Sequence, residues 1–302
     1  MRHEPVLLKE VIHSLQLKPG MNVIDCTLGD AGHSEEILKY TAPFGRLLGI
    51  DADAESLIRA KQYLYEESKR VVFVRDNFVH LKDIVDREGF HPVHRILADF
   101  GWSSPQFAER GRGFSFQNAE EVLDMRYNVR EDTPSAKDIV NNSTEDELYQ
   151  IFRRYGEEKL SREIARGVIE ERKNKHITTV GDFVEIILKQ YRKKLRTDKE
   201  IPWIGGLHPA TKVFQAFRIE VNKELEVIEK FLPQGLEVLS SGGILAVITF
   251  HSLEDRIVKH FFKKQDKKTF QILTKKPIVC SEDEGKRNPR ARSAKLRLIQ
   301  KI

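Results

Sequence analysis

The sequence predicts an α/β protein in which a parallel, doubly wound sheet is interrupted by an all-helical insertion. Strand-like apolar runs alternate with helical segments in the N-terminal third of the chain. This alternation is typical of a parallel sheet that is covered by helices. It then stops for a long stretch with helical spacing, and it resumes toward the C-terminal end. One sheet domain with an insertion is the simplest arrangement that fits this order.

The elements before the interruption are strands with helices between them. We expect strands at 22–26, 46–51, 71–76 and 94–99, and helices at about 33–40 and 54–66. Helical spacing within the interruption is found at 145–155, 159–174 and 179–195. After it we expect a helix at 222–240, a strand at 242–250, a helix at 253–264 and extended runs at 270–279 and 294–302. The predicted domains are therefore 1–105 and 213–302 for the sheet and 106–212 for the insertion.

The composition is that of a globular protein with a sizeable core. The 302 residues are 40% hydrophobic and 32% charged, and no apolar run is long enough to cross a membrane. The N-terminal residues lack the apolar segment of a signal peptide, so we expect a cytoplasmic protein. Cys26 and Cys280 show no pairing or metal-ligand spacing, which fits a reducing compartment. No other set of ligand-type residues has metal spacing, and we predict no metal.

Positive charge is concentrated near the C-terminal end. The net charge is +5 and the pI is about 9.0. The run 285–302 contains Lys286, Arg287, Arg290, Arg292, Lys295 and Arg297. Residues 294–302 alternate like a strand, so we expect the preceding basic loop to be anchored to a sheet edge. An anchored basic loop suits a phosphate backbone better than a mobile one, although a solvated tail is the alternative.

The stretch "VIDCTLGDAGHSEEIL" (23–38) runs from a strand through a glycine-bearing loop into a helix. Glycine allows close approach of a ligand, and a helix N-terminus favours polar or negative groups. Asp51 ends the next strand, where an acid can bind ribose hydroxyls. Dinucleotide enzymes share this arrangement, but the third glycine of their fingerprint is missing, and Asp30 would place negative charge near a pyrophosphate. S-adenosyl-L-methionine, which has no phosphate and carries a positive sulfonium, fits better; a tight turn without a ligand is the alternative.

The segment "ADFGWSSPQ" follows the fourth predicted strand. Asp99 lies at the carboxyl end of that strand, where open α/β sheets bind ligands, and Ser103, Ser104 and Pro105 form the next turn. Enzymes that methylate exocyclic amino groups carry a short polar turn at this place. Oxygen acceptors aimed at the amino N–H bonds favour the tetrahedral geometry in which the nitrogen attacks the methyl carbon. Phe100 and Trp102 either stack on a base or are core aromatics.

Several motifs together resemble one family. They are "HEPVLLKEVI", "DCTLGDAGHS", "SSPQF", "RGFSF", "LDMRY", "HPATKVFQAFRIEVNKEL", "FHSLEDRIVKHFF" and "NPRARSAKLR", spread from residue 3 to residue 298. In this order they resemble the bacterial small-subunit ribosomal RNA methyltransferase H family. The resemblance implies a Rossmann-like class I S-adenosylmethionine-dependent methyltransferase sheet with an inserted helical domain. It also implies methyl transfer to N4 of a cytidine in the decoding region of 16S rRNA, within the small ribosomal subunit.

The resemblance also implies site residues. The cofactor-binding positions are Ala31, Gly32, His33, Asp51, Phe78, Asp99 and Gln106, and the catalytic positions are Asp99, Ser103 and Ser104. Two positions depart from the family pattern. Ala31 stands where glycine is usual, which suggests that the turn does not need a positive φ. Trp102 stands where a smaller residue is usual, so base stacking there is either particular to this chain or absent.

The remaining candidates are residues that would contact RNA: Trp102, Arg126, His208, Arg218, His251, Arg290 and Arg292. His208 and His251 are RNA contacts, acid–base groups or structural histidines, and the residues alone leave these roles open. Glu254 and Asp255 are expected to cap or charge the start of the helix at 253. For the insertion, RNA recognition competes with a structural cap over the cofactor site. A nicotinamide dehydrogenase and a non-catalytic RNA-binding protein remain the alternative functions.

Overall fold

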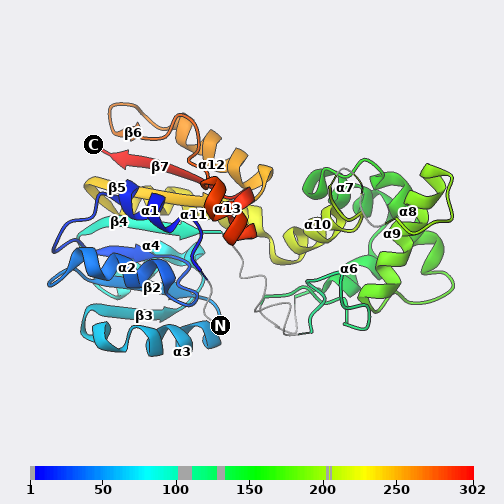
Figure 1. The fold of residues 1–302 in the computed structure, drawn as a ribbon, viewed down its shortest axis with the longest axis horizontal. Coiled ribbons are helices and arrows are strands. Elements are labelled where there is room, and N and C mark those ends of the chain that lie inside the picture. The colour runs from blue at the N-terminus through cyan, green and yellow to red at the C-terminus, as the bar shows by residue number, and fades with distance from the viewer. Residues whose placement is uncertain (1–3, 101–110, 128–132, 202–203, 205) are drawn as a thin grey trace. The chain divides into compact units, whose positions relative to one another are not determined.

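The computed structural model describes residues 4–302 except 101–110, 128–132, 202–203 and 205. The chain divides into two compact units, which Figure 1 shows. The sheet unit comprises Met1–Trp102 and Leu225–Ile302, and the helical unit comprises Ser103–Glu224. Within the described ranges, no helix is long and apolar enough to cross a membrane.

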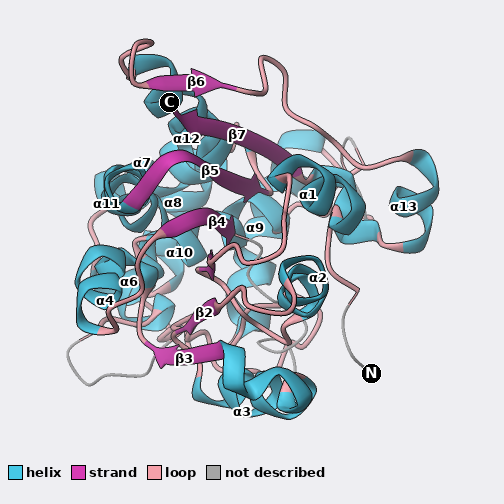
Figure 2. Cartoon of the chain, turned by 90° about the vertical axis from the view of Figure 1, so that its left-hand side faces the viewer, coloured by secondary structure: helices cyan, strands magenta, loops and turns pink. Residues whose placement is uncertain are grey.

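The sheet unit is built on a seven-stranded sheet with the order β3-β2-β1-β4-β5-β7-β6 among the described residues (Figure 2). Its strands are β1 (Val23–Asp25), β2 (Leu47–Asp51), β3 (Val71–Arg75), β4 (Val93–Asp99), β5 (Leu239–Thr249), β6 (Phe270–Ile272) and β7 (Lys295–Lys301). The pairs from β3 to β5 are parallel, whereas β7 is antiparallel to both β5 and β6. The predicted parallel sheet is therefore confirmed.

Helices cover both faces of this sheet. They are α1 (Leu8–Leu15), α2 (Gly32–Thr41), α3 (Ala54–Tyr63), α4 (Leu81–Arg87), α11 (Glu224–Val238), α12 (Ser252–Lys264) and α13 (Glu282–Arg287). Figure 2 shows α2 and α4 on opposite sides of the sheet. Each face of the sheet has its own hydrophobic core, and neighbouring residues of β4 belong to different ones. Ile96 lies in the core with Phe90 and Phe231, and Leu97 lies in the core with Leu38. Burial on both faces explains why these strands are continuous apolar runs.

The helical unit contains α6 (Ala136–Asn142), α7 (Glu145–Gly156), α8 (Ser161–Glu171), α9 (Val180–Leu195) and α10 (Thr211–Asn222). Its core includes Phe152, Phe183 and Phe217, with ring centroids 4.9–6.3 Å apart. Capping boxes begin α6, α7 and α9, each with a Ser or Thr whose oxygen accepts the backbone N–H three residues later. These three helices therefore start where their sequences provide a cap.

The second domain boundary differs from the predicted one. The insertion was expected to end at 212, but the helical unit continues to Glu224 and includes α10. The physical reason is that α10 packs on α7. The backbone carbonyl of Lys212 approaches Gly156 so closely that a Cβ at Gly156 would lie 2.6 Å from its oxygen, and Phe217 packs against Phe152.

The C-terminal basic run also differs from the prediction. It was expected to form a loop anchored to a sheet edge. Instead, β7 lies between β5 and β6, and the run before it folds into α13 and the 3-10 helix η3 (Pro289–Ser293). Ser281 caps α13 by accepting the Glu284 N–H at 3.2 Å. A short capped helix inside a basic, polar stretch has too little apolar periodicity to be predicted.

Candidate active site

The loop after β1 is bonded to the ends of both neighbouring strands. The Leu28 N–H donates to the carbonyl of Ile50 on β2 at 3.0 Å, and the Cys26 N–H donates to that of Leu97 on β4 at 2.9 Å. The Thr27 hydroxyl accepts the Asp99 N–H at 2.8 Å. The loop and the carboxyl ends of β2 and β4 thus form one connected edge, as the sequence predicted from their order.

Ala31 adopts a left-handed backbone conformation with φ 58°, beside Gly29 with φ 51°. The expectation that alanine at 31 signals a turn without positive φ is therefore wrong. Ala31 is the N-cap of α2 and is 1% exposed, and its N–H and carbonyl bond to Leu28 and Glu35. These contacts hold Ala31 in place. They therefore stabilise it in a left-handed conformation that usually requires glycine.

Asp51 ends β2 and holds the loop. Its carboxylate accepts the Gly29 N–H at 2.8 Å and the Asp53 N–H at 2.8 Å. Burial raises the pKa of Asp51 to about 6, although these two backbone bonds oppose the rise. Each carboxylate oxygen has a second lone pair, so the group can bind the loop and still accept ribose hydroxyls.

Asp25 is a buried acid that the sequence reasoning missed. Its carboxylate accepts the Ser34 hydroxyl at 2.6 Å and the Thr27 N–H at 3.1 Å, and burial raises its pKa. Asp25 therefore ties the two ends of the loop together. Its place as the last residue of a strand, immediately before the loop, is the signal that could have identified it.

Asp30 is ion-paired within the site. The Arg59 Nε lies 2.8 Å from its Oδ1, and the Asp30 side chain is only 11% exposed. This cation offsets the negative charge that would disfavour a pyrophosphate ligand. Of the two sequence arguments against a dinucleotide, the charge of Asp30 is therefore weakened, and the missing third glycine remains.

Phe78 and Phe100 belong to one aromatic cluster. Phe78 lies in η2 (Phe78–His80), and its ring stacks on Phe100 at 5.7 Å and meets Phe231 edge-on at 5.2 Å. The two phenylalanines are 6% and 2% exposed. Phe100 is therefore a core aromatic, and Phe78 can offer a ligand little more than the rim of its ring. Trp102, Ser103, Ser104 and Gln106 lie outside the described residues.

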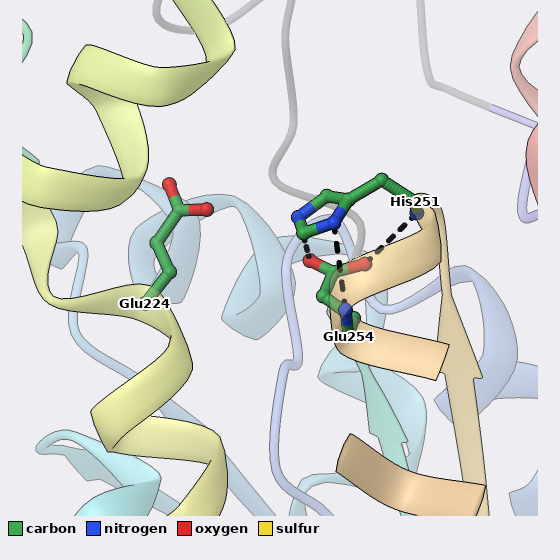
Figure 3. A group of neighbouring side chains, drawn as sticks. All are labelled: Glu224, His251 and Glu254. Atoms are coloured by element: carbon green, nitrogen blue, oxygen red, sulfur yellow. Dashed lines mark hydrogen bonds and ion pairs between the residues drawn. The ribbon is translucent and has the colours of Figure 1, made fainter. Parts of the chain in front are cut away.

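His251 and Glu254 form a capping box at the start of α12 (Figure 3). The Glu254 carboxylate accepts the N–H groups of Phe250 at 2.7 Å and of His251 at 3.2 Å, while the imidazole Nδ1 accepts the Glu254 N–H at 3.5 Å. The prediction that Glu254 caps this helix is confirmed. Because Nδ1 accepts, the proton of the neutral ring is on Nε2, which faces Glu254 Oε1 at 3.1 Å. Figure 3 also draws Glu224, which belongs to the helical unit.

Asp255, the second acid of that turn, is paired with β7. The Arg297 Nε donates to its Oδ1 at 2.6 Å, and the neighbouring positive charge lowers the pKa of Asp255 against the effect of burial. Asp255 therefore joins the start of α12 to the sheet. It lies in the first helical turn as predicted.

The arginines and the histidine proposed for RNA in the helical unit have partners inside that unit. Arg126 pairs with Asp124 at 2.6 Å, and Arg218 makes a two-pronged pair with the buried Glu224 at 2.8 and 3.1 Å. The His208 ring stacks on Phe116 with centroids 4.5 Å apart. These contacts give each side chain a structural role, and RNA contact stays a prediction for all of them.

Arg290 and Arg292 lie in η3 at the C-terminal side of α13. The Arg292 Nε donates to the Gly285 carbonyl at 2.6 Å, while the residue as a whole is exposed. Arg290 is half-buried. The structure therefore orients the guanidinium of Arg292, as a preorganised phosphate contact requires.

Four features define a class of protein: the strand order, the antiparallel β7, the loop after β1, and the carboxylates at the ends of β2 and β4. This is a Rossmann-like class I methyltransferase that uses S-adenosyl-L-methionine, and the predicted fold class is confirmed. The model of the MraW methylase family matches residues 1–302, and the chain belongs to that family.

Curated relatives agree with this assignment over nearly the whole chain. A "Ribosomal RNA small subunit methyltransferase H" of Clostridioides difficile is 44% identical over 316 residues, covering 99% of each chain. A protein of the same name from Clostridium botulinum is 43% identical, covering 100% of this chain and 99% of its own. That of Dictyoglomus thermophilum is 45% identical over 296 residues, covering 98% and 95%. The family suggested by the sequence motifs is confirmed.

Proposed function

We propose that this enzyme transfers a methyl group from S-adenosyl-L-methionine to N4 of a cytidine in the decoding region of 16S rRNA. The observation that supports it most is the connected edge formed by Asp51, the loop after β1 and Asp99, in a chain of the MraW methylase family. The names of the curated relatives supply the substrate class, small-subunit ribosomal RNA. Since that substrate is cytoplasmic, the proposal places the enzyme there.

The residues at this edge fit S-adenosyl-L-methionine. Gly29 and Ala31 are left-handed in this loop, and α2 begins directly after them at Gly32, so the N-terminus of a helix lies at the edge. Asp51 would accept the ribose hydroxyls, and Asp99 and Gln106 would contact the methionine side of the ligand. When bound, the cofactor supplies an electrophilic methyl group on a positive sulfonium.

The chain's own residues must compensate for a weak nucleophile. The lone pair of a cytosine amino nitrogen is delocalised into the ring. Oxygen acceptors supplied by Asp99, Ser103 and Ser104 would favour the tetrahedral amino group that can attack the methyl carbon. The amino proton becomes acidic as transfer proceeds, so water can take it and no protein base is required.

RNA binding is proposed to involve the basic η3 and the helical unit. Arg290 and Arg292 would contact phosphates. In the helical unit, the basic residues on α8 and α9 include Arg162, Arg166, Lys189 and Lys193. His208 and Arg218 are candidates in the same unit, and His251, Arg126 and Trp102 remain further candidates.

Transfer of labelled methyl groups tests this function against its two alternatives. The protein is incubated with labelled S-adenosyl-L-methionine and either free 16S rRNA or assembled small subunits, both from cells that lack the methyl group. Label should enter the RNA of at least one substrate. A nicotinamide-linked absorbance change would support a dehydrogenase instead, and RNA binding without cofactor binding would support a non-catalytic protein.

A further inference from the structure

Residues 4–7, here called the strap, lie against the loop that we propose to bind the cofactor. The Val6 carbonyl accepts a hydrogen bond from His33 Nε2 at 2.9 Å, in a buried position. The Pro5 ring packs over Gly32, where an added Cβ would lie 3.0 Å from Pro5 Cγ. Because a carbonyl can only accept, His33 Nε2 must carry a proton, and the strap therefore fixes the orientation of that ring.

The strap is in turn held by residues 281–293, here called the C-terminal arm. The Glu284 carboxylate accepts the Leu7 N–H at 2.7 Å, and this bond is buried. Arg287 pairs with the Glu4 carboxylate at 2.7 Å, and the Asn288 side-chain amide donates to the Glu4 carbonyl at 3.3 Å. Glu284 is 8% exposed, whereas the Glu4 and Arg287 side chains are 45% and 62% exposed. The buried contact at Glu284 is therefore stronger than the exposed ion pair between Arg287 and Glu4.

The backbone is strained both in the strap and in the loop that the strap contacts. Leu7 has φ 55° and is fully buried, and Ala31 has φ 58°. A left-handed conformation in a residue other than glycine costs free energy, and it persists where the surroundings determine it. At Leu7 the surroundings are the Glu284 carboxylate, which takes the N–H, and α1, whose Val11 N–H bonds to the Leu7 carbonyl.

We propose that Glu284 is a positioning residue for S-adenosyl-L-methionine. It acts through the Leu7 main chain, which fixes the strap, and the strap fixes Gly32 and His33 at the start of α2. No atom of Glu284 needs to touch the cofactor. The inference rests on the proposed function, because it assumes that the loop after β1 binds S-adenosyl-L-methionine.

The same chain of contacts joins the C-terminal arm to the cofactor loop. Arg290 and Arg292, the proposed phosphate contacts, follow Glu284 on this arm, and Arg292 is bonded to Gly285 next to it.

The test compares Glu284→Ala with Glu284→Gln in the full-length protein. The glutamine Oε1 can still accept the Leu7 N–H, and alanine cannot. We expect Glu284→Ala to weaken S-adenosyl-L-methionine binding in calorimetry, and to raise its KM, by about tenfold, equivalent to about 1.4 kcal/mol. The kcat at saturating cofactor and RNA should change by less than about twofold, because the transition state is contacted by other groups. Glu284→Gln should stay within about threefold of wild type.

Glu282→Ala, which removes an exposed acid from the same helix, is the matched control and should leave cofactor affinity unchanged. Wild-type cofactor affinity in Glu284→Ala, or equal losses in the alanine and glutamine variants, would overturn the proposal. If Glu284→Ala does not fold, hydrogen exchange in the wild-type protein decides: the cofactor must slow exchange in the peptide containing Leu7, and no slowing refutes the role. A wild-type protein that binds no S-adenosyl-L-methionine would instead refute the proposed function itself.

Discussion

Asp51 is a single residue that holds the loop after β1 and that we also propose to bind the cofactor. It already accepts the Gly29 and Asp53 N–H groups, and these bonds orient both oxygens of the carboxylate. An oriented carboxylate accepts ribose hydroxyls without a further loss of side-chain entropy. The sequence located this acid from its place at the end of a strand. Its second role, holding the loop, depends on contacts across 22 residues of sequence that no local pattern contains.

Cofactor affinity should depend on pH through Asp51. With a pKa of about 6, the carboxyl is ionised above that pH, and only the ionised form is a full acceptor for two hydroxyls. Protonation on acidification therefore removes binding, so affinity at pH 5 should be about tenfold weaker than at pH 7. Calorimetry across this range measures it. Asp51→Asn should bind weakly with a flatter profile, and an unchanged profile in that variant would remove Asp51 from the titration.

Ser104 offers a prediction about the chemical step. If its hydroxyl is an acceptor for the target amino group, Ser104→Ala should slow single-turnover methyl transfer about ten- to hundredfold at saturating cofactor. Cofactor affinity should barely move. Asp99→Asn should differ by weakening the cofactor as well. Wild-type transfer by Ser104→Ala would remove this hydroxyl from the mechanism.

At the level of elements, the strands were predicted better than the short helices. β1, β2, β4 and the second half of β5 are apolar runs buried on both faces, whereas β3 is mostly half-buried. The burial is visible in the apolar character of the residues themselves. The predicted boundary at 212 separated α10 from the helical unit, whose core contains Phe214 and Phe217. The packing of α10 on α7, which places it there, is a tertiary contact that no local pattern contains. The prediction for Ala31 was wrong for a similar reason: tertiary contacts, rather than intrinsic preference, set its φ.

The arginines of the C-terminal arm lead to a separate prediction about RNA binding. Neutralising Arg290 and Arg292 together should weaken rRNA binding and reduce its salt dependence, while cofactor affinity in the absence of RNA stays unchanged. The slope of log affinity against log salt should fall by about 0.7–0.9 for each arginine–phosphate interaction that the substitutions remove. Filter binding at several salt concentrations measures this slope. The same slope in wild type and variant would show that the arm does not contact phosphate.

At the level of the whole molecule, the sequence predicted a sheet domain carrying an all-helical insertion, and two compact units of these kinds are present. Each has its own hydrophobic core, so the insertion is a folded body in its own right. Gln106 lies outside the residues that the structure describes. The other cofactor candidates lie in the sheet unit, whereas Arg126, His208 and Arg218 lie in the helical unit. Cofactor binding and part of RNA recognition are therefore proposed to reside in separate units.

Methylation of one cytidine amino group in small-subunit rRNA is the function on which the proposed site roles depend. Mass mapping of nucleosides tests this function directly. Purified protein is incubated with labelled S-adenosyl-L-methionine and rRNA that lacks the modification, and the labelled nucleoside is then identified. We predict a single labelled product, N4-methylcytidine, in a fragment from the decoding region. Label on a ring carbon, on another base or on a ribose would contradict this function.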